Sequence, residues 1–301
     1  MFLKIFVFFL SIILTLILYS YVIDKKRTEK EIMLDFKPMN IKFPVYEKEN
    51  RIPLNAYRIY GLRDGKGDLE KYQNSFDEST KNCPGLKNNI IFGKKEMDSF
   101  ILKYYNQEVL DIVNLINHEF SACVADVFRL LIIYAKGGVY LDIKSKILKD
   151  IVPDLEKYND KLIVSPFCHI PFIFTGWTKV NFPYGEISNW FFAAPKGHPV
   201  LREAIQQTLT NIKMCYERKE FHNQASNLIL SMTGPDMLSD VINKTYHQQE
   251  IQKLNSFTIK DIFKPTFLGW EGKIKKENEK INNSKIQGKN HWKKMKKNLF
   301  V

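Results

Sequence analysis

A strongly apolar helix that runs into two glycines and then a short strand is the feature that most restricts the fold of this chain. The helix is predicted from about Glu119 to Lys136, because large apolar side chains dominate that segment. Lys136 in its last turn and Gly137 just after it indicate where the helix ends. The residues from Val139 to Ile143 have the composition of a strand. The double glycine therefore turns the chain so that this strand runs back beside the helix.

Other strands and helices are predicted on both sides of this segment. The strands are expected at Ala56–Tyr60, Asn89–Phe92, Lys161–Ser165 and Asn189–Ala193, and the helices at 95–105, 109–116, 198–213, 223–232 and 235–247. The sequence contains no internal repeat. This succession favours an α/β fold with a mixed sheet flanked by helices over a barrel.

The predicted helix carries one acid and one base in an otherwise apolar setting. Residues 122, 126, 129 and 133 share a helix face, so Asp126 and Arg129 project side by side. Two interpretations stay open for the pair: a partly buried ion pair, or groups that hydrogen-bond neighbouring hydroxyls of a sugar. The turn at the glycines favours the sugar site, because it brings Asp142 at the end of the strand near the pair.

The pattern Asp126-x-x-Arg129 followed by Gly137-Gly138-x-Tyr140-x-Asp142 resembles the sugar-binding region of glycosyltransferase family 32 and its relatives. Weaker similarity continues in Asn189–Pro199, in Thr233-Gly234-Pro235 and in His291-Trp292. The resemblance implies a single-domain GT-A-like fold. It also implies retaining transfer of a sugar from a nucleoside diphosphate donor to a hydroxyl of a glycan, a glycolipid or a protein.

The resemblance also implies roles for particular residues. Asp126, Arg129 and Asn189 would bind the donor sugar. Tyr140 and Asp142 would bind the nucleotide and cofactor, with Asp142 as the first acid of a D-x-D motif that holds the ribose and helps to hold Mn²⁺.

Lys144 departs from this motif, because its position carries the acid that ligates the metal in the family. Residues 142 and 144 lie on the same side of a strand, and a protonated lysine offers no oxygen ligand to manganese. Three interpretations stay open. Lys144 itself neutralises the leaving diphosphate, or Asp142 holds the metal with other ligands such as Asp150 or His291. In the third, the site is degenerate, and the protein is a catalytically inactive membrane protein that binds nucleotide sugars or glycans.

The amino-terminal region is predicted to anchor the chain in a membrane. Nineteen uncharged residues from Ile5 to Ile23 are enough to span a bilayer as a helix; a cleaved signal peptide is the alternative, although no A-x-A-like site follows. The predicted organisation is a short tail (1–4), the anchor (5–23), a stem (24–50) and a glycosyltransferase domain with a basic tail (51–301).

The orientation of this single-pass anchor stays open. The basic residues at 25–27 favour a cytosolic domain. The sequons at Asn243 and Asn282, together with the family resemblance, favour a lumen of the Golgi or ER type.

Charge and cysteine content restrict the partners. The net charge of +12 favours anionic partners such as nucleoside diphosphates or a lipid surface. A nucleic acid is not expected, because the sequence carries no nucleic-acid-binding motif. The four cysteines form no C-x-x-C pair, which argues against zinc. Asp236 is expected to cap a helix, and the ten lysines between residues 272 and 297 are expected to form a basic surface.

Overall fold

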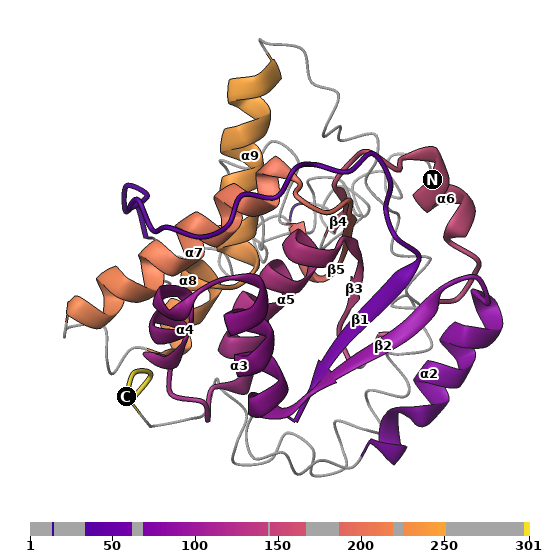
Figure 1. Ribbon diagram of the computed structural model, residues 1–301, viewed down its shortest axis with the longest axis horizontal. Helices are drawn as coiled ribbons and strands as arrows, with labels where there is room; N and C mark the ends of the chain where they lie inside the picture. Colours follow the sequence, from indigo (N-terminus) through magenta and orange to yellow (C-terminus); the bar gives the residue numbers. More distant parts are fainter. Residues whose placement is uncertain are drawn as a thin grey trace, which may run out of the picture.

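The computed structural model describes residues 14, 34–61, 69–143, 145–166, 187–218, 225–250 and 298–301. The described strands are β1 (Asn55–Tyr60), β2 (Lys87–Phe92), β3 (Gly138–Leu141), β4 (Ile163–Pro166) and β5 (Ile187–Ala194). The described helices are α2 (Glu70–Asn82), α3 (Gly93–Tyr104), α4 (Gln107–Asn114), α5 (Ser121–Lys136), α6 (Val152–Lys157), α7 (Pro199–Glu217), α8 (Ala225–Met232) and α9 (Pro235–Glu250) (Figure 1).

The five described strands form one mixed sheet in the order β2-β1-β3-β5-β4. Strand β1 is parallel to both β2 and β3, whereas β5 is antiparallel to β3 and to β4. The carboxyl ends of β1, β2 and β3 therefore share one edge of the sheet with the start of β5. The chain visits β2 on one side of β1 and then returns to β3 on the other side. This reversal is a topological switch point, where open α/β sheets commonly bind ligands.

Helices cover both faces of the sheet and form two separate cores (Figure 1). On one face Tyr140 packs into the larger core, which contains α5 and buried residues of α3, α4, α7, α8 and α9. On the other face Val139 and Leu141 pack with residues of the loop after β3 and of α6. Because side chains alternate along a strand, neighbouring residues of β3 serve different cores. Strand β3 is consequently packed on both of its faces.

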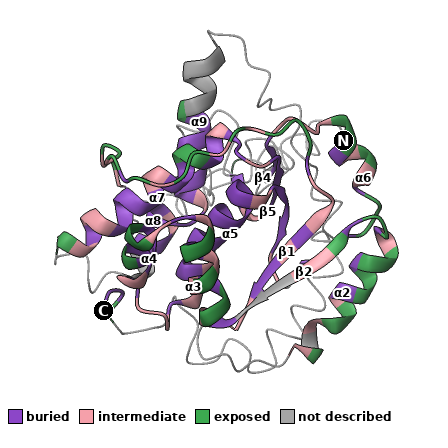
Figure 2. Ribbon diagram, in the orientation of Figure 1, coloured by how far each residue is buried: buried purple, intermediate pink, exposed green. Residues whose placement is uncertain are grey.

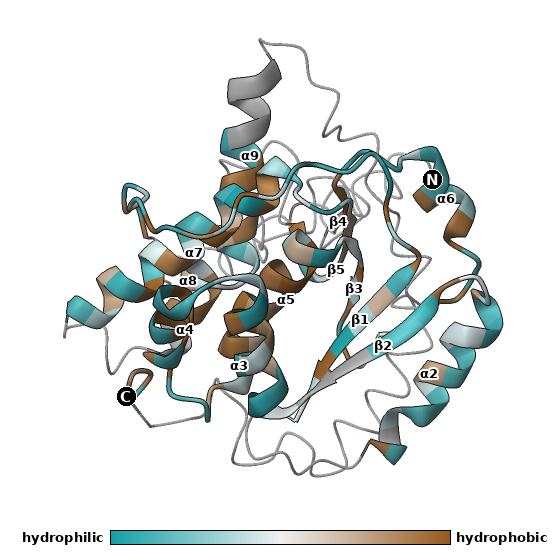
Figure 3. Cartoon of the chain, in the orientation of Figure 1, coloured by the Kyte–Doolittle hydropathy of each residue, from teal (hydrophilic) through white to brown (hydrophobic). Residues whose placement is uncertain are grey.

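Helix α5 is the centre of the larger core. Its side chains are buried along nearly the whole helix (Figure 2), and they are predominantly apolar (Figure 3). Such a helix must be covered on all sides. Helices α3 and α7 and the strands β1, β3 and β5 all contact it.

Residues 34–50, the described part of the predicted stem, lie along the domain. Ile41 is buried in the larger core. The Met39 N–H donates to Oγ1 of Thr210 in α7 at 2.9 Å, and the ring of Tyr46 packs 5.4 Å from that of Tyr134 in α5. This part of the predicted stem is therefore packed against the domain.

The mixed α/β sheet flanked by helices is confirmed, and the predicted strands and longer helices lie within a few residues of the described ones. Two of the described helices, α2 and α6, are not among those predicted from the sequence. Helix α2 is mostly polar and has no side-chain cap at its start, so neither its periodicity nor its termini identify it. Helix α6 has only six residues.

Within the part of the chain that the structure describes, no helix is long and apolar enough to cross a bilayer. Apart from Leu14, the predicted anchor from Ile5 to Ile23 lies outside the described residues. The sequon at Asn243 is described: this side chain is buried and its Nδ2 donates to the Ser239 carbonyl at 2.7 Å. An oligosaccharide could not be attached there in the folded domain, so this sequon does not support a lumenal location. The sequon at Asn282 lies outside the described residues.

The turn between α5 and β3 depends on its two glycines. Gly137 and Gly138 both have positive φ angles, 64° and 106°, which residues with a Cβ rarely adopt. A Cβ on Gly138 would lie 2.5 Å from the carbonyl oxygen of Asn55 in β1. Strand β3 can approach β1 only because this Cβ is absent.

Replacing Gly138 with alanine is expected to lower the free energy of unfolding by about 2 kcal/mol or more, since the change adds backbone strain and a clash. Denaturant unfolding followed by circular dichroism measures this loss. Gly85→Ala is the matched control. Its Cβ would lie at 3.2 Å from Cγ2 of Val152, and its φ is not positive, so a change within about 0.5 kcal/mol is expected. Equal losses in the two variants would contradict this explanation of the turn.

Candidate functional site

The guanidinium of Arg129 in α5 lies between two carboxylates. Its Nη2 is 2.9 Å from Oδ1 of Asp126 and 3.3 Å from Oδ1 of Asp142. Its Nη1 donates to the carbonyl of Asn189 in β5, and its Cζ lies 4.6 Å from the centre of the Tyr140 ring. Only 5% of the residue is exposed. Arg129 thus joins α5, β3 and β5 at the carboxyl edge of the sheet.

Asp126 forms the buried end of this network. Its Oδ1 accepts a hydrogen bond from Nδ2 of Asn189 at 2.9 Å, and its Oδ2 accepts one from Oγ1 of Thr233 at 3.3 Å. With Arg129 as a third partner, both carboxylate oxygens are engaged. Asp126 is therefore held in one orientation, and it fixes the side chain of Asn189 as well.

Asp142 forms the open end of the network, with 41% of its side chain exposed. It follows the last residue of β3, and its N–H still pairs with the Trp190 carbonyl of β5 at 2.9 Å. The Tyr140 hydroxyl donates to its Oδ1 at 2.6 Å. Tyr140 and Asp142 face the same side because they are two positions apart. A ligand at the sheet edge would meet Asp142 first.

Burial governs the protonation of the network. Desolvation raises the pKa of the Asp126 carboxyl to about 7, although the charge of Arg129 lowers it. Burial lowers the pKa of Arg129, but the charges of Tyr140, Asp142 and Asp126 raise it by more, so Arg129 stays a cation. Burial also raises the pKa of Tyr140 well above its usual value, which keeps its hydroxyl a hydrogen-bond donor to Asp142.

Five of the residues predicted for the site come together in the structure: Asp126, Arg129, Tyr140, Asp142 and Asn189. Their proximity is observed, and the roles assigned to them stay predictions. Lys144 and His291, together with its neighbour Trp292, lie outside the described residues.

The described residues offer few ligands for a metal ion. No group of three or more histidine, cysteine or carboxylate side chains among them is arranged to hold one. Asp150 accepts hydrogen bonds from the Cys83 thiol at 3.2 Å and from the Val152 N–H at 3.0 Å, so it stabilises the start of α6. In the described part of the network, Oδ2 of Asp142 is the carboxylate oxygen without a recorded partner. A manganese ion would need further ligands from elsewhere.

Two residues of this region were not recognised from the sequence as parts of the site. Thr233 belongs to a segment for which the sequence indicates only a weak similarity to the family, yet its hydroxyl contacts Asp126. Arg58 was assigned only to a strand. In the structure it is fully buried, and its Nη1 donates to the carbonyls of Asp142 at 3.0 Å and Ser145 at 2.5 Å. The available signal was a basic residue inside an apolar strand, which requires a buried partner.

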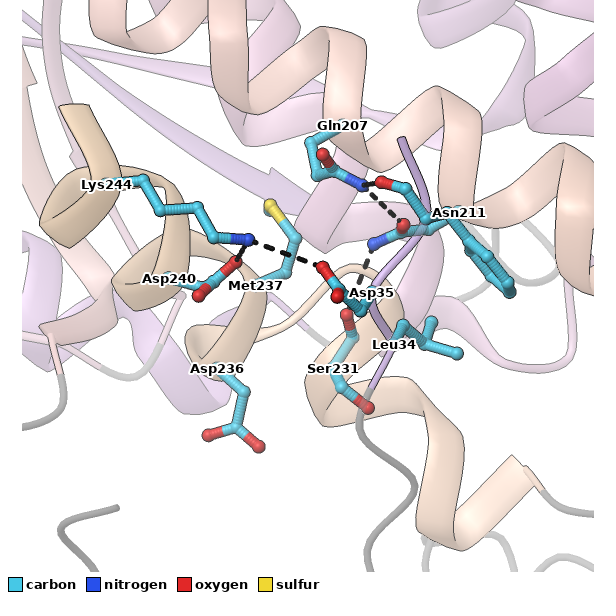
Figure 4. Close-up of a pocket in the computed structure, with 10 residues that line it drawn as sticks. Leu34, Asp35, Gln207, Asn211, Ser231, Asp236, Met237, Asp240 and Lys244 are labelled. Carbon is cyan, nitrogen blue, oxygen red and sulfur yellow. Dashed lines mark hydrogen bonds and ion pairs between the residues drawn. The ribbon is translucent and has the colours of Figure 1, made fainter. Parts of the chain in front are cut away.

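A separate surface pocket lies where residues 34–36 meet α7, α8 and α9, and none of the network residues lines it. Figure 4 shows its side chains, among which Lys244 pairs with Asp240 at 2.7 Å and with Asp35 at 3.8 Å. Asp236 at the start of α9 also lines this pocket and is buried. The pair of Asp35 and Lys244 therefore links the amino-terminal segment to α9.

The network of Asp126, Arg129 and Asp142 lies in a segment of the chain that is similar to known proteins. Residues 68–164 match a family model described as "Glycosyltransferase sugar-binding region containing DXD motif". This segment is therefore similar to a glycosyltransferase sugar-binding region, in agreement with the resemblance drawn from the sequence. Arg129, Asp126 and Asp142 all lie inside the matched segment.

Three curated relatives are similar to the chain. The "Initiation-specific alpha-1,6-mannosyltransferase" of Candida albicans is 27% identical over 244 residues, which cover 71% of this chain and 62% of the relative. The protein of the same name from Schizosaccharomyces pombe is 30% identical over 122 residues, or 39% of this chain and 30% of the relative. Cytotoxin-L of Paraclostridium sordellii is 31% identical over 121 residues, or 40% of this chain and 5% of the toxin.

The chain thus spans less than two thirds of the length of each of these relatives. Among solved structures, the PaToxG glycosyltransferase aligns with 77% of this chain and 75% of its own, at 17% identity and a TM-score of 0.45.

The raised pKa of Asp126 predicts how stability depends on pH. Its pKa is about 7 in the folded protein and about 3.9 in an unfolded chain. The folded state therefore binds the proton more tightly, and this contribution to stability is lost as the pH rises through 7. We expect the unfolding free energy of the wild type, relative to Asp126→Asn, to rise by about 1 to 3 kcal/mol from pH 8 to pH 5.

Denaturant titrations of both proteins at several pH values measure this difference. Because asparagine does not titrate, the difference between the two proteins isolates the titration of Asp126 from that of the groups not coupled to it. A difference that stays constant from pH 8 to pH 5 would show that Asp126 titrates like an ordinary carboxyl group.

Proposed function

We propose that this protein is a glycosyltransferase that moves a sugar from a nucleoside diphosphate donor to a hydroxyl of a glycan, a glycolipid or a protein. One observation carries the proposal. The acid–base network of Asp126, Arg129 and Asp142 lies at the switch point of the sheet, inside the segment that matches a glycosyltransferase sugar-binding region. The GT-A architecture implied by the family resemblance is part of the proposal.

The contacts of the network are suited to holding a sugar. Carboxylates that accept and guanidiniums that donate can bind neighbouring hydroxyls in a fixed geometry. Arg129 and Asp126 already fix one another and Asn189, so little ordering would be needed when the sugar binds. Asp142, the exposed member, would hold the ribose of the donor.

A hexose donor is supported by the relatives. Two of them are named as alpha-1,6-mannosyltransferases, which makes mannose the first donor sugar to test, among UDP- and GDP-linked candidates. Retention of configuration is proposed from the family resemblance. A retaining reaction on the donor's front face needs no protein base.

The charge that develops on the leaving diphosphate must be stabilised, and this is usually the largest contribution to such a reaction. Two versions of the site would supply the positive charge that stabilises the diphosphate. In one, the ammonium of Lys144 neutralises the diphosphate directly. In the other, Asp142 holds Mn²⁺ with ligands from outside the described residues, such as His291, and the metal supplies the positive charge. The presence of lysine in place of the second acid also favours an alternative function, a protein that binds the nucleotide sugar without turnover.

A donor-hydrolysis screen tests these possibilities. Wild type and variants are incubated with a panel of UDP- and GDP-linked sugars, with added Mn²⁺ or with EDTA, and the released nucleotide is measured. Asp142→Ala is expected to reduce turnover by about a hundredfold or more. Asp111→Ala removes an exposed carboxylate on α4 and should leave turnover unchanged.

The outcomes separate the alternatives. Undiminished turnover in Asp142→Ala would contradict the site. A strict requirement for metal would exclude direct neutralisation by Lys144, whereas turnover in EDTA that is lost in Lys144→Ala, mainly in kcat, would support it. Nucleotide binding with no turnover of any donor would indicate the inactive binding protein.

We propose further that residues 5–23 anchor the protein in a membrane as a single span, with the domain facing a lumen of the Golgi or ER type. The full chain is expected to stay with membranes during alkaline carbonate extraction, because a span of this length is buried in lipid. A chain that begins at residue 34 should be released. Release of the full chain would argue against the anchor, and protease protection of the domain in sealed vesicles reports its orientation.

A further inference from the structure

Arg58 is a buried cation that contacts the proposed donor site from the face of the sheet opposite to that of Arg129. It lies on β1 at the switch point, and none of its surface is exposed. Tyr140 and Arg129 belong to the face covered by α5. Arg58 instead lies on the face covered by α2, with its Cζ 5.0 Å from the centre of the Phe76 ring.

Nη1 of Arg58 contacts the chain that follows β3 directly, and Nη2 contacts it through a serine of α2. Nη1 donates to the carbonyls of Asp142 at 3.0 Å and Ser145 at 2.5 Å. Nη2 donates to Oγ of Ser79 at 3.2 Å, and the same Oγ accepts the N–H of Ile147 at 3.0 Å. The N–H of Ser145 bonds back to the Asp142 carbonyl at 2.8 Å. One guanidinium and one serine thus hold both ends of the turn from residue 142 to residue 147.

Burying the charge of Arg58 costs more free energy than is expected for a contact that only stabilises the fold. Among the described residues the acceptors of Arg58 are three neutral oxygens, and a buried charge that is hydrogen-bonded to neutral groups alone is unfavourable. Burial accordingly lowers the pKa of Arg58 to about 10, although the charge of Asp142 raises it. A neutral side chain at this position would avoid that cost but could not donate to two carbonyls and a hydroxyl at once.

We infer that Arg58 is a positioning residue of the donor site, which fixes the main chain of Asp142 and the turn after it while Tyr140 and Arg129 fix the Asp142 carboxylate. The inference rests on the proposed function for the ligand, a nucleoside diphosphate. Asp142 is then held at its main chain from one core and at its side chain from the other.

The test is a double-mutant cycle between Arg58→Lys and Asp142→Asn. Lysine keeps the charge but lacks the planar fork that reaches several acceptors. The affinity for UDP and GDP is measured by calorimetry, and the nucleotide that binds the wild type is used throughout. Arg58→Lys should weaken binding about tenfold in the wild type, the effect of losing about one hydrogen bond to a charged group. In the Asp142→Asn background it should weaken binding less than about twofold, because the positioned carboxylate is already absent.

A role limited to stability would leave the affinity of the folded protein unchanged, and an equal loss of affinity in both backgrounds would show that Arg58 acts independently of the Asp142 carboxylate. Either result would overturn the inference. Ile59→Val is the matched control, because it removes a methylene group from a buried residue of the same strand that packs in the other core. It should leave affinity unchanged in both backgrounds. Ser79→Ala, which loosens the same turn and keeps Arg58, should weaken binding in the same direction by a smaller factor, and its failure to do so would also count against the inference.

Hydrogen exchange separates a failure of this inference from a failure of the proposed function. The amides of Ser145 and Ile147 should exchange faster in Arg58→Lys than in the wild type, while amides in the middle of α5 should not change. This result is expected whether or not any nucleotide binds. Faster exchange in a protein that binds neither UDP nor GDP would reject the proposed ligand alone. Unchanged exchange at both amides would reject the positioning role.

Discussion

The organisation of this protein depends on one buried cation, the guanidinium of Arg129. Buried charges are rarely a net source of stability, and removing one partner leaves the other uncompensated. In the described chain its partners come from three parts of the fold: Ala125 and Asp126 from α5 itself, Asp142 from the end of β3 and the Asn189 carbonyl from β5. The arrangement therefore forms only when α5, β3 and β5 are in register. The glycine turn provides that register, because it lets β3 leave α5 at a short distance and pair with β1.

The charges around the sheet edge nearly balance. Arg129 contacts the carboxylates of Asp126 and Asp142, whereas Arg58 contacts the main-chain carbonyl of Asp142 from the other face of the sheet. The described network is therefore neutral, or positive when Asp126, whose pKa lies near 7, is protonated. Both versions of the proposed site consequently need a positive charge from outside this network, either the ammonium of Lys144 or a manganese ion.

The sequence predicted the part of the structure in which local signals agree. Apolar periodicity, a glycine stop and a strand of high β-propensity indicate α5, the turn and β3, and the helical spacing of Asp126 and Arg129 indicates a shared face. Helix α2 could not be predicted, because its residues are mostly polar and its start carries no cap. Arg58 could not be assigned to the site, because its partners are main-chain carbonyls 84 and 87 positions away. Backbone acceptors leave no pattern in a sequence, so only the fold reveals them.

Two separate cores meet at Asp142, and this has a consequence for how the site responds to change. Side chains of β3 alternate between the cores, so the strand cannot move toward one without leaving the other. The carboxylate of Asp142 is tied to the core of α5 and its carbonyl to the layer of α2. A shift in either layer would therefore reorient the residue that reaches solvent. Asp142, the most exposed residue of the network, is therefore held by contacts to both its side chain and its main chain. A preorganised binding group needs such contacts.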